Sequence, residues 1–459
     1  MDNPARPILF VSLPGAGTFH PLLVLAGELA RRGVENVWFA TDEPRRAEIE
    51  QTPLEFASLG EVIPELSAVT WDDEVYRAVT QPSRFGAHRA VIRHAYRPVL
   101  ALAKYRQLEA VVDKVHPAVM VIDCETRFAI NLAIARRIPY VLSVPRVPSN
   151  VLTPFTPFGR SYVSRKFPTP HTGLPYDMNL AAQLRNQWFR LRSLAMFFNP
   201  AMGRALREDI AIGKELGLPQ PESMTRVAQA ELVLHYSIAE IDYPLELPGH
   251  VRLVGAMVPP LPEAPDGELA GWLDARPSVI YIGLGTITRL TGAEVSALVE
   301  VARRLDGAHH VLWKLPPPQQ HLLPPRPSLP GNLRIESWVP SQHDVLAHPN
   351  VTAFVTHGGG NGFHEGLYFG KPLVVRPLWT DCHDNAVRGQ DAGVSVTLDP
   401  RRTADPDHVA GLLSRVLKEP SFRQQADRLA ALMRAAGGRE AAADLVLGLP
   451  ALREPAGTA

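Results

Sequence analysis

The 459-residue chain has only two cysteines, Cys124 and Cys382, and its 47 basic and 47 acidic residues give a formal net charge of +0. Two cysteines cannot build a disulfide framework or a thiolate zinc site, so we expect a protein of the reducing cytoplasm. The balanced charge argues against a general attraction to nucleic acid or anionic membrane, although a locally basic site stays open. No apolar run approaches the roughly 18 residues of a membrane span, and Ile8–Leu13 is too short for a signal peptide.

Length and composition indicate large cores in more than one domain. Hydrophobic residues make up 46% and charged residues 20% of the chain, values that exclude a disordered or coiled-coil protein. A prior of roughly 100–200 residues per domain predicts two to four domains, and two large domains would fit. The 44 prolines exceed the usual share of roughly 5% about twofold, and they gather in the expected loops.

The N-terminal half alternates apolar runs with helical segments. Ile8–Leu13 is typical of a buried strand, a glycine-containing loop follows, and Pro21–Arg32 is typical of a helix that leads to a second strand at Val37–Ala40. This order is the βαβ opening of a parallel sheet. The same pattern of strands returns at Ala118–Asp123 and at Pro139–Ser143.

A second set of apolar runs begins near Val251, and the proline-rich stretch after it carries the expected domain boundary. We expect an N-terminal domain at residues 1–245, a linker at 246–270, a C-terminal domain at 271–435, and a helix or tail at 436–459 whose return to the N-terminal domain stays open. The predicted fold class is α/β, with two Rossmann-like, doubly wound parallel-sheet domains facing a cleft. Ligands of such sheets bind beyond the carboxyl ends of the strands, so the cleft is the expected site.

A glycine-rich segment in the C-terminal half carries the clearest chemistry. The predicted strand Val351–Thr356 runs through His357 into three glycines and then a helix, which presents free backbone N–H groups and a positive helix end to phosphate. Asn361 can add a side-chain donor, as can His357. Glu365, about one helical turn later, can accept both hydroxyls of a ribose. Trp338 offers an aromatic face for a base.

This segment, roughly Trp338 to Ala386, closely resembles the nucleotide-sugar signature of family 1 glycosyltransferases, the UDP-dependent enzymes of the GT-B fold. Bacterial members of this family modify natural products such as macrolides. The plant pattern runs from Trp-x-Pro-Gln through His-Cys-Gly-Trp-Asn-Ser to a Glu, a Pro, Asp/Glu-Gln and Asn-Ala. The later matching positions are His357, Gly358, Gly359, Gly360, Asn361, Gly362, Glu365, Pro377, Asp381, Cys382, Asn385 and Ala386.

The resemblance implies roles for individual residues. It assigns the sugar of the donor to Asp381 and Cys382. It implies that the N-terminal domain binds the acceptor and that the C-terminal domain binds the nucleotide sugar. The residues implied in nucleotide binding are Gly285, Thr286, Trp338, Val339, Gln342, His357, Gly359, Gly360, Asn361, Gly362 and Glu365.

This chain departs from the family pattern at three places. One extra residue follows Pro340, so either Ser341 or Gln342 takes the glutamine role, and we favour Gln342. Gly362 replaces a phosphate-binding serine and leaves only its backbone. Cys382 replaces the glutamine that usually contacts the sugar, which predicts looser discrimination between hexoses.

The same resemblance places a catalytic histidine at His20 and an orienting carboxylate at Asp123. It implies an inverting, metal-independent transfer of a sugar, with glucose favoured because Asp381 is retained, from a UDP-sugar to a hydroxyl of a lipophilic small molecule. Neither a cofactor nor a metal is expected, and nucleic acid is not an expected partner. The sequence leaves open the acceptor, the use of thymidine-linked donors and the oligomeric state. Candidate residues of an apolar acceptor pocket are Phe19, Phe155, Phe158 and Tyr162.

Two other functions compete with a transferase. Gly15, Gly17 and Asp42 nearly complete a dinucleotide fingerprint, which favours an NAD(P)-dependent oxidoreductase, but His20 occupies the place of the third glycine. The second alternative is a protein that holds a nucleotide sugar or a lipid without turnover. The presence of both His20 and Asp123 argues against it.

Overall fold

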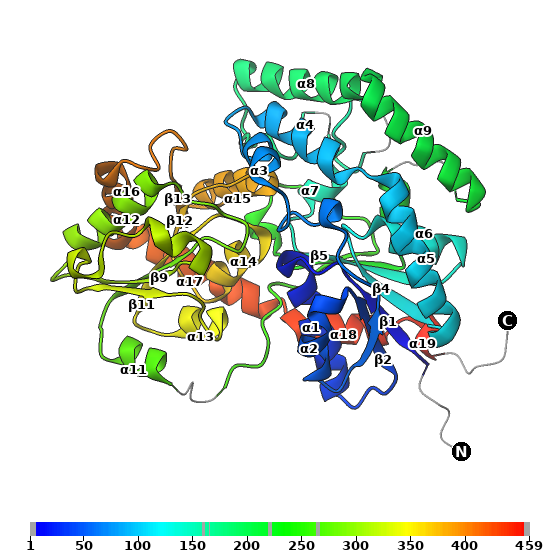
Figure 1. The fold of residues 1–459 in the computed structure, drawn as a ribbon, viewed down its shortest axis with the longest axis horizontal. Helices are drawn as coiled ribbons and strands as arrows, with labels where there is room; N and C mark the ends of the chain where they lie inside the picture. The colour runs from blue at the N-terminus through cyan, green and yellow to red at the C-terminus, as the bar shows by residue number, and fades with distance from the viewer. Residues whose placement is uncertain (1–5, 158–160, 165, 219–222, 263–266, 454–459) are drawn as a thin grey trace.

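The computed structural model describes residues 6–157, 161–164, 166–218, 223–262 and 267–453, and it contains two parallel sheets (Figure 1). The N-terminal sheet has the order β3-β2-β1-β4-β5-β6-β7, and the C-terminal sheet has the order β10-β9-β8-β11-β12-β13. This architecture confirms the predicted fold class. The N-terminal strands are β1 (Ile8–Val11), β2 (Val37–Thr41), β3 (Glu55–Ser58), β4 (Val119–Asp123), β5 (Tyr140–Val144), β6 (Leu232–His235) and β7 (Val251–Leu253). The C-terminal strands are β8 (Val279–Gly283), β9 (His310–Lys314), β10 (Leu333–Glu336), β11 (Val351–Thr356), β12 (Leu373–Val375) and β13 (Ser395–Thr397).

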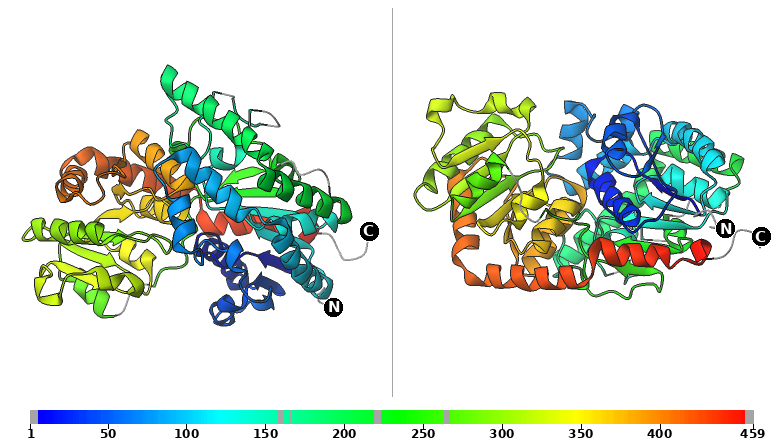
Figure 2. Two further views of the ribbon diagram at one scale, coloured as in Figure 1. Left: turned by 45° about the horizontal axis from the view of Figure 1, so that its top comes forward. Right: turned by 90° about the horizontal axis from the view of Figure 1, so that it is seen from below.

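Helices cover both faces of each sheet (Figures 1 and 2). Those that precede the domain boundary are α1 (Ala16–Arg31), α2 (Arg46–Glu50), α3 (Asp73–Val79), α4 (Arg84–Ala95), α5 (Pro98–Val115), α6 (Arg127–Ala135), α7 (Ser149–Leu152), α8 (Leu180–Ala195), α9 (Pro200–Glu215) and α10 (Ser223–Ala228). Those that follow it are α11 (Glu268–Asp274), α12 (Gly292–Arg304), α13 (Gln342–Ala347), α14 (Gly360–Tyr368), α15 (Thr380–Asp391), α16 (Pro406–Lys418), α17 (Pro420–Ala435), α18 (Gly438–Leu447) and α19 (Pro450–Arg453).

The strands are apolar on both sides because each sheet is buried between helices. Along β1, Ile8 and Phe10 join a core under α1, while Leu9 and Val11 join the core under α5 and α6. In both sheets the strand order reverses at one point, between β1 and β4 and between β8 and β11. Loops at these switch points leave room for a ligand at the carboxyl edge of the sheet.

The N-terminal sheet extends further along the chain than the sequence predicts. Strand β7 lies inside the expected linker 246–270, yet it pairs with β6 through Val233 and Val251. The first domain therefore includes this strand. Three residues of strand next to a proline-rich stretch carry too little apolar pattern to reveal which sheet they join.

The C-terminal segment lies against the first domain, where α18 packs on α1 (Figure 2, right). Ala442, Ala443 and Val446 belong to the core under α1. Arg32, the residue that follows α1, is 2.5 Å from Asp444 on α18. Segments near the beginning and the end of the described chain, α1 and α18, therefore share one core.

A buried ion pair links α15 to the first domain. The guanidinium of Arg388 lies 2.9 Å from the carboxylate of Asp242, and both side chains are at most 3% exposed. The hydroxyl of Ser149 donates to Asp242 at 2.6 Å and accepts from Arg388 at 2.5 Å. The ring of Tyr243 faces the same guanidinium, 4.6 Å from its centroid. These groups satisfy one another, which a buried charge requires.

Asp242→Ala leaves Arg388 buried without its carboxylate, and we expect it to lower the free energy of unfolding by about 3–5 kcal/mol. Urea unfolding followed by tryptophan fluorescence measures this loss. Asp444→Ala is the matched control, because it also removes a carboxylate from an ion pair but at a position that is 71% exposed. The control should cost less than about 1 kcal/mol. Equal losses in the two variants would show that the buried pair does not hold the domains together.

Candidate active site

The glycine loop after β11 is built so that only glycine fits. Gly358 has a φ of +79°, and a Cβ there would lie 2.8 Å from a methyl group of Val375. A Cβ on Gly360, the first residue of α14, would collide with the carbonyl oxygen of Pro145 in the other domain. The N-terminus of the nine-residue α14 therefore sits directly against the first domain. Its free N–H groups and positive dipole end suit a phosphate.

His357 and Gly285 bring two loops of the C-terminal domain together. A Cβ on Gly285 would lie 2.6 Å from the imidazole of His357, so the turn after β8 rests on that ring. Burial, with the nearby Lys314 and Arg376, lowers the pKa of His357 to about 4. The imidazole is thus neutral at pH 7, and its Nδ1 has no hydrogen-bond partner among the described residues. Thr286, next to Gly285, is exposed in the same turn.

Glu365 is fixed by neighbours on α13. Its carboxylate accepts a hydrogen bond of 2.6 Å from Nε2 of Gln342, and it lies 3.3 Å from Nε2 of His343. Burial alone would raise the pKa of Glu365, but His343 and Gln342 hold it below its usual range, so the group is charged at pH 7. The hydroxyl of Tyr281 donates to Oε1 of Gln342 at 3.1 Å. Ser341 instead caps α13, because its hydroxyl accepts from the N–H of Asp344.

Trp338 lies nearby with its side chain 59% exposed, and the ammonium group of Lys314 is 4.9 Å from the centre of its ring. An exposed indole at this place can receive a flat base. Val339, also predicted to bind nucleotide, has a buried side chain, so only its backbone can reach a ligand.

Both residues predicted to bind sugar are buried, Asp381 with 8% exposure and Cys382 with none. Asp381 lies in the first turn of α15, and the hydroxyl of Thr380 donates to it at 3.0 Å. Cys382 is fully buried, and burial raises the pKa of its thiol. Its backbone packs against Gly358, where a Cβ would meet the Cys382 carbonyl at 3.1 Å. The predicted contact of this thiol with a sugar therefore does not fit the structure.

His20 lies in the first turns of α1, beside the glycine loop after β11 and the first residues of α14, together called the donor loop. The side-chain amide of Asn361 in that loop donates to the carbonyl of Ala16, at 3.4 Å. The His20 side chain is 43% exposed, and its Nε2 is 3.4 Å from Oε2 of Glu48 on α2. Burial and Arg45 lower the pKa of His20, while Glu48 raises it, and the net shift is downward. The imidazole is therefore neutral at pH 7.

Asp123 differs from the predicted geometry. The structure describes no hydrogen bond between its carboxylate and His20, because both oxygens are already used. Asp123 is fully buried and ties the end of β1 to the turn after β4. The carboxylate beside His20 is that of Glu48, which is 28 residues away in the chain and carries no sequence signal for this role. The donors to Asp123 are the hydroxyl of Ser12, the N–H groups of Leu13, Glu125 and Thr126, and the hydroxyl of Thr126.

A cavity of about 300 Å³ opens at the carboxyl ends of β1 and β4. Its walls are mainly apolar, and Arg127, Asp209 and Tyr96 form a polar group at one side, with Asp209 accepting from both partners. The apolar lining includes Leu13, Leu66, Ile92, Ala95, Ala101, Leu102, Phe128, Ile212 and Leu216. This position and composition suit a lipophilic acceptor.

The aromatic residues predicted for an acceptor pocket lie elsewhere. Phe19 is fully buried in the core against Phe39. Phe155 packs on the rings of His88 and His171, and Tyr162 packs on the core under α5 and α6. Phe158 lies outside the described residues. Phe19, Phe155 and Tyr162 do not line the 300 Å³ cavity, and their place in an acceptor pocket stays a prediction.

Two further features bear on the alternatives. Asp42, the ribose-binding acid of a dinucleotide fingerprint, is buried and pairs with Lys104 at 2.6 Å, so it is not free for a ribose. In the described ranges, no group of three or more His, Cys, Asp or Glu side chains is arranged to hold a metal ion. Among the described helices, none has the length and apolar character of a membrane span.

Fold and site together define a two-domain α/β protein, with a glycine loop that suits a phosphate on one domain and a half-exposed histidine on the other. The sequence comparison agrees, since residues 45–436 match the family described as UDP-glucoronosyl and UDP-glucosyl transferase. The chain therefore belongs to that family.

Similar proteins include both curated sequences and solved structures. UDP-glucosyltransferase 2 of Dactylopius coccus is 27% identical over 339 residues, which cover 70% of this chain and 60% of that protein. UDP-glucuronosyltransferase 2B17 of Rattus norvegicus is 28% identical over 49% of this chain and 41% of that protein. The chain thus spans about 60% or less of these relatives. The glycotransferase of kitacinnamycin shares the fold with a TM-score of 0.71 and 22% identity over 96% of this chain and 98% of that one.

The glycosyltransferase SsfS6 of Streptomyces sp. SF2575, solved with thymidine diphosphate, has a TM-score of 0.63 and 17% identity over 97% of this chain and all of that one. At this identity the likeness shows the fold alone.

We expect Glu365→Ala to weaken UDP binding by roughly 1.5–3 kcal/mol, since it removes charge-assisted hydrogen bonds to the ribose. Calorimetric titration with UDP measures the effect. Glu336→Ala is the control, because this carboxylate at the end of β10 pairs with Arg334 instead. Unchanged UDP affinity in Glu365→Ala would mean that the carboxylate only fixes α13 against α14.

Proposed function

We propose that the chain is an inverting, metal-independent glycosyltransferase that moves a hexose, with glucose favoured, from a UDP-sugar to a hydroxyl of a lipophilic small molecule in the cytoplasm. The observation that carries the proposal is the position of His20. Its half-exposed, neutral imidazole lies on the helix whose first carbonyl receives Asn361 of the donor loop. A base on one domain thus meets a phosphate-binding loop on the other.

In the proposed reaction, the ring nitrogen of His20 that does not face Glu48 takes the proton of the acceptor hydroxyl, because Nε2 lies against the Glu48 carboxylate. The acceptor oxygen forms a bond to the anomeric carbon as the bond from that carbon to the diphosphate oxygen breaks. Attack from the face opposite the leaving group converts an α-linked donor into a β-linked product. The diphosphate leaves with the electron pair of the broken bond.

The charge that grows on the leaving diphosphate would be stabilised by the glycine loop. The free N–H groups at the start of α14 would donate to the diphosphate, and the amide of Asn361, which donates to the carbonyl of Ala16 at 3.4 Å, lies in the same first turn. Fixed dipoles of this kind need no reorganisation during the reaction, which makes them effective in a site closed by two domains.

We assign the orientation of His20 to Glu48 and give Asp123 an indirect role. Glu48 contacts the imidazole and also pairs with Arg45, whose guanidinium donates to the carbonyl of Pro14 just before α1. Asp123 instead holds Ser12 and the end of β1.

The 300 Å³ cavity begins beside that strand end and is the proposed acceptor site. Asp381, which is 8% exposed at the start of α15, is the proposed partner of two sugar hydroxyls.

His20→Ala should lower turnover by about 10²–10⁴-fold while UDP affinity stays nearly unchanged, because only the base is removed. UDP release from UDP-glucose, measured with a panel of lipophilic alcohols and phenols, gives the rate, and thymidine-linked glucose tests the choice of nucleotide. Retained activity in His20→Ala would exclude it as the base.

Glu48→Gln tests the same base through its pH profile. Glu48 raises the pKa of His20, so its removal should lower that pKa further. Activity falls as pH drops through the pKa of the base, and the acid limb of kcat/KM should therefore move to lower pH in Glu48→Gln. Glu50→Gln, an exposed carboxylate on the same helix, should leave the limb in place. If the acid limb of kcat/KM does not move in Glu48→Gln, Glu48 does not act on His20.

A further inference from the structure

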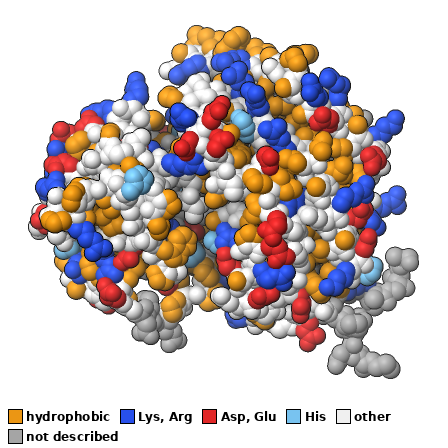
Figure 3. All heavy atoms as spheres, in the orientation of Figure 1, with side chains coloured by type: hydrophobic (Ala, Val, Ile, Leu, Met, Phe, Trp, Pro, Cys, Tyr) orange, Lys and Arg blue, Asp and Glu red, His pale blue; other side chains and the backbone are white. Residues whose placement is uncertain are grey.

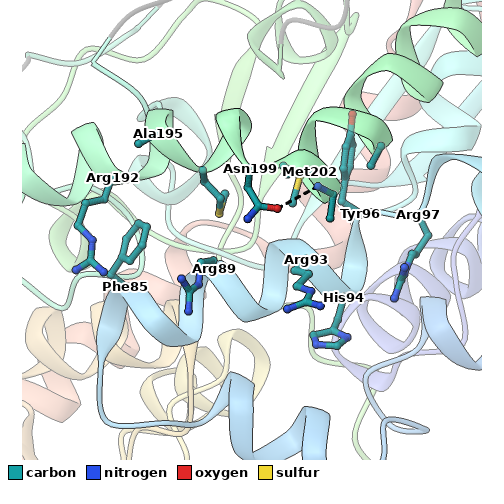
Figure 4. A pocket seen from close by; sticks show the side chains of 13 residues that line it. Phe85, Arg89, Arg93, His94, Tyr96, Arg97, Arg192, Ala195, Asn199 and Met202 are labelled. Carbon is teal, nitrogen blue, oxygen red and sulfur yellow. Dashed lines mark hydrogen bonds between the residues drawn. The ribbon is translucent and has the colours of Figure 1, made fainter.

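Two neighbouring segments of the first domain are rich in arginine and free of acids. Residues 84–97 contain four arginines and residues 178–207 contain five, and neither range contains Asp or Glu. Helix α4 comes from the first range and α8 from the second, and the two helices lie side by side (Figure 4). In a chain with a formal net charge of +0, this is a strong local separation of charge.

A cavity of about 680 Å³ lies between α4 and the turn from α8 to α9. Arg89, Arg93, Arg97 and Arg192 line it together with apolar side chains, and its lining includes no acid (Figure 4). Within the described parts of the chain, none of these four arginines forms an ion pair. Arg192 only stacks on Phe85, with the guanidinium 3.9 Å from the ring centre. Four guanidinium groups that form no ion pair with the described residues surround one cavity and are suited to anionic groups such as phosphates.

The outer face of α8 is apolar although it faces solvent. Leu180, Leu184, Trp188 and Leu191 follow helical spacing on the side opposite the buried Phe189, and Phe198 follows just beyond the helix. These five side chains are 49–82% exposed. From Leu180 to Leu191 the stripe is about 16 Å long. A contiguous exposed apolar patch of this kind marks an interaction surface.

The shape and charge of this surface favour a flat, anionic partner. Helix α8 forms the upper edge of the molecule in Figure 1, and in Figure 3 hydrophobic atoms line that edge with Lys and Arg directly beside them. Helix α8 protrudes as a ridge, and such a surface can contact a flat partner more readily than it can enter a pocket. A second copy of the chain would place the same uncompensated arginines against one another, which costs electrostatic energy.

We propose that the α8 face docks on a lipid bilayer that contains anionic phospholipids. The stripe from Leu180 to Phe198 enters the boundary between headgroups and acyl chains, and the arginines around the cavity bind lipid phosphates. Tyr96 and Arg97 line both this cavity and the 300 Å³ acceptor cavity. A membrane-dissolved acceptor would therefore arrive next to its site, although the docking itself does not depend on the transferase activity.

The test is flotation of the full chain with vesicles of phosphatidylcholine alone or mixed with phosphatidylglycerol. We expect binding only to the anionic vesicles, and weaker binding as salt is raised. Arg89→Gln with Arg93→Gln should weaken the partition coefficient roughly twenty-five-fold, at about fivefold per arginine. Leu184→Ser with Trp188→Ser should weaken it at least tenfold. Arg428→Gln and Val69→Ser are matched controls, because they change an exposed arginine and an exposed apolar residue elsewhere.

Thermal unfolding midpoints identify any variant that fails to fold. Every substituted side chain is exposed, so we expect midpoints equal to that of the unchanged chain. Three results would overturn the proposal. These are equal binding to neutral and anionic vesicles, variants that bind like the controls, and a concentration-dependent dimer that Trp188→Ser abolishes, since the last would make the stripe an interface between copies.

Discussion

The close approach of Gly360 to the carbonyl of Pro145 is the contact on which the proposed site depends. No side chain fits between them, so the N-terminus of α14 rests directly on the loop after β5 in the other domain. Three further contacts between the domains stabilise the position of α14 against the first domain. The amide of Asn361 donates to Ala16, His364 lies 2.9 Å from the hydroxyl of Ser237, and Arg388 pairs with Asp242. A histidine on α1 and the glycine-rich start of α14 are thereby brought to one place, although they belong to different sheets.

Buried ionisable groups at this junction are held in defined states by their neighbours. His364 and His357 are neutral because burial lowers the pKa of each to about 4. Each would take up a proton in the unfolded chain near pH 6.5, so their contribution to stability is lost as pH falls toward 4. Glu365 stays charged for the opposite reason, since His343 and Gln342 offset its burial. At pH 7 the junction therefore holds the carboxylate of Glu365 charged and these two imidazoles neutral.

Much of the fold and the donor side of the site could be predicted from the sequence because their signals are local. Apolar strands such as Val351–Thr356 and the glycines that follow them lie in one short segment, and helix α14 begins where the pattern predicts. The acceptor side could not be predicted in the same way. Glu48 reaches His20 from another helix, and the 300 Å³ cavity is assembled from α4, α5, α6 and α9.

Single residues also show where local patterns fail. Cys382 matches a sugar-binding position, yet its side chain is enclosed by the packing around Gly358. The net charge of the whole chain does not reveal the two arginine-rich segments that lack acids. They form one surface because α4 and α8 lie side by side in the fold. Tertiary packing decides how deeply a side chain is buried and which distant residues become neighbours. The composition of the chain predicts neither.

A crystal structure of the full chain with UDP tests the central claim most directly. The account predicts the ribose hydroxyls within hydrogen-bonding distance of Glu365, the uracil against Trp338, and the terminal phosphate at the N–H groups that begin α14, facing His20. UDP bound away from Glu365, or a terminal phosphate on the far side of α14 from His20, would contradict it.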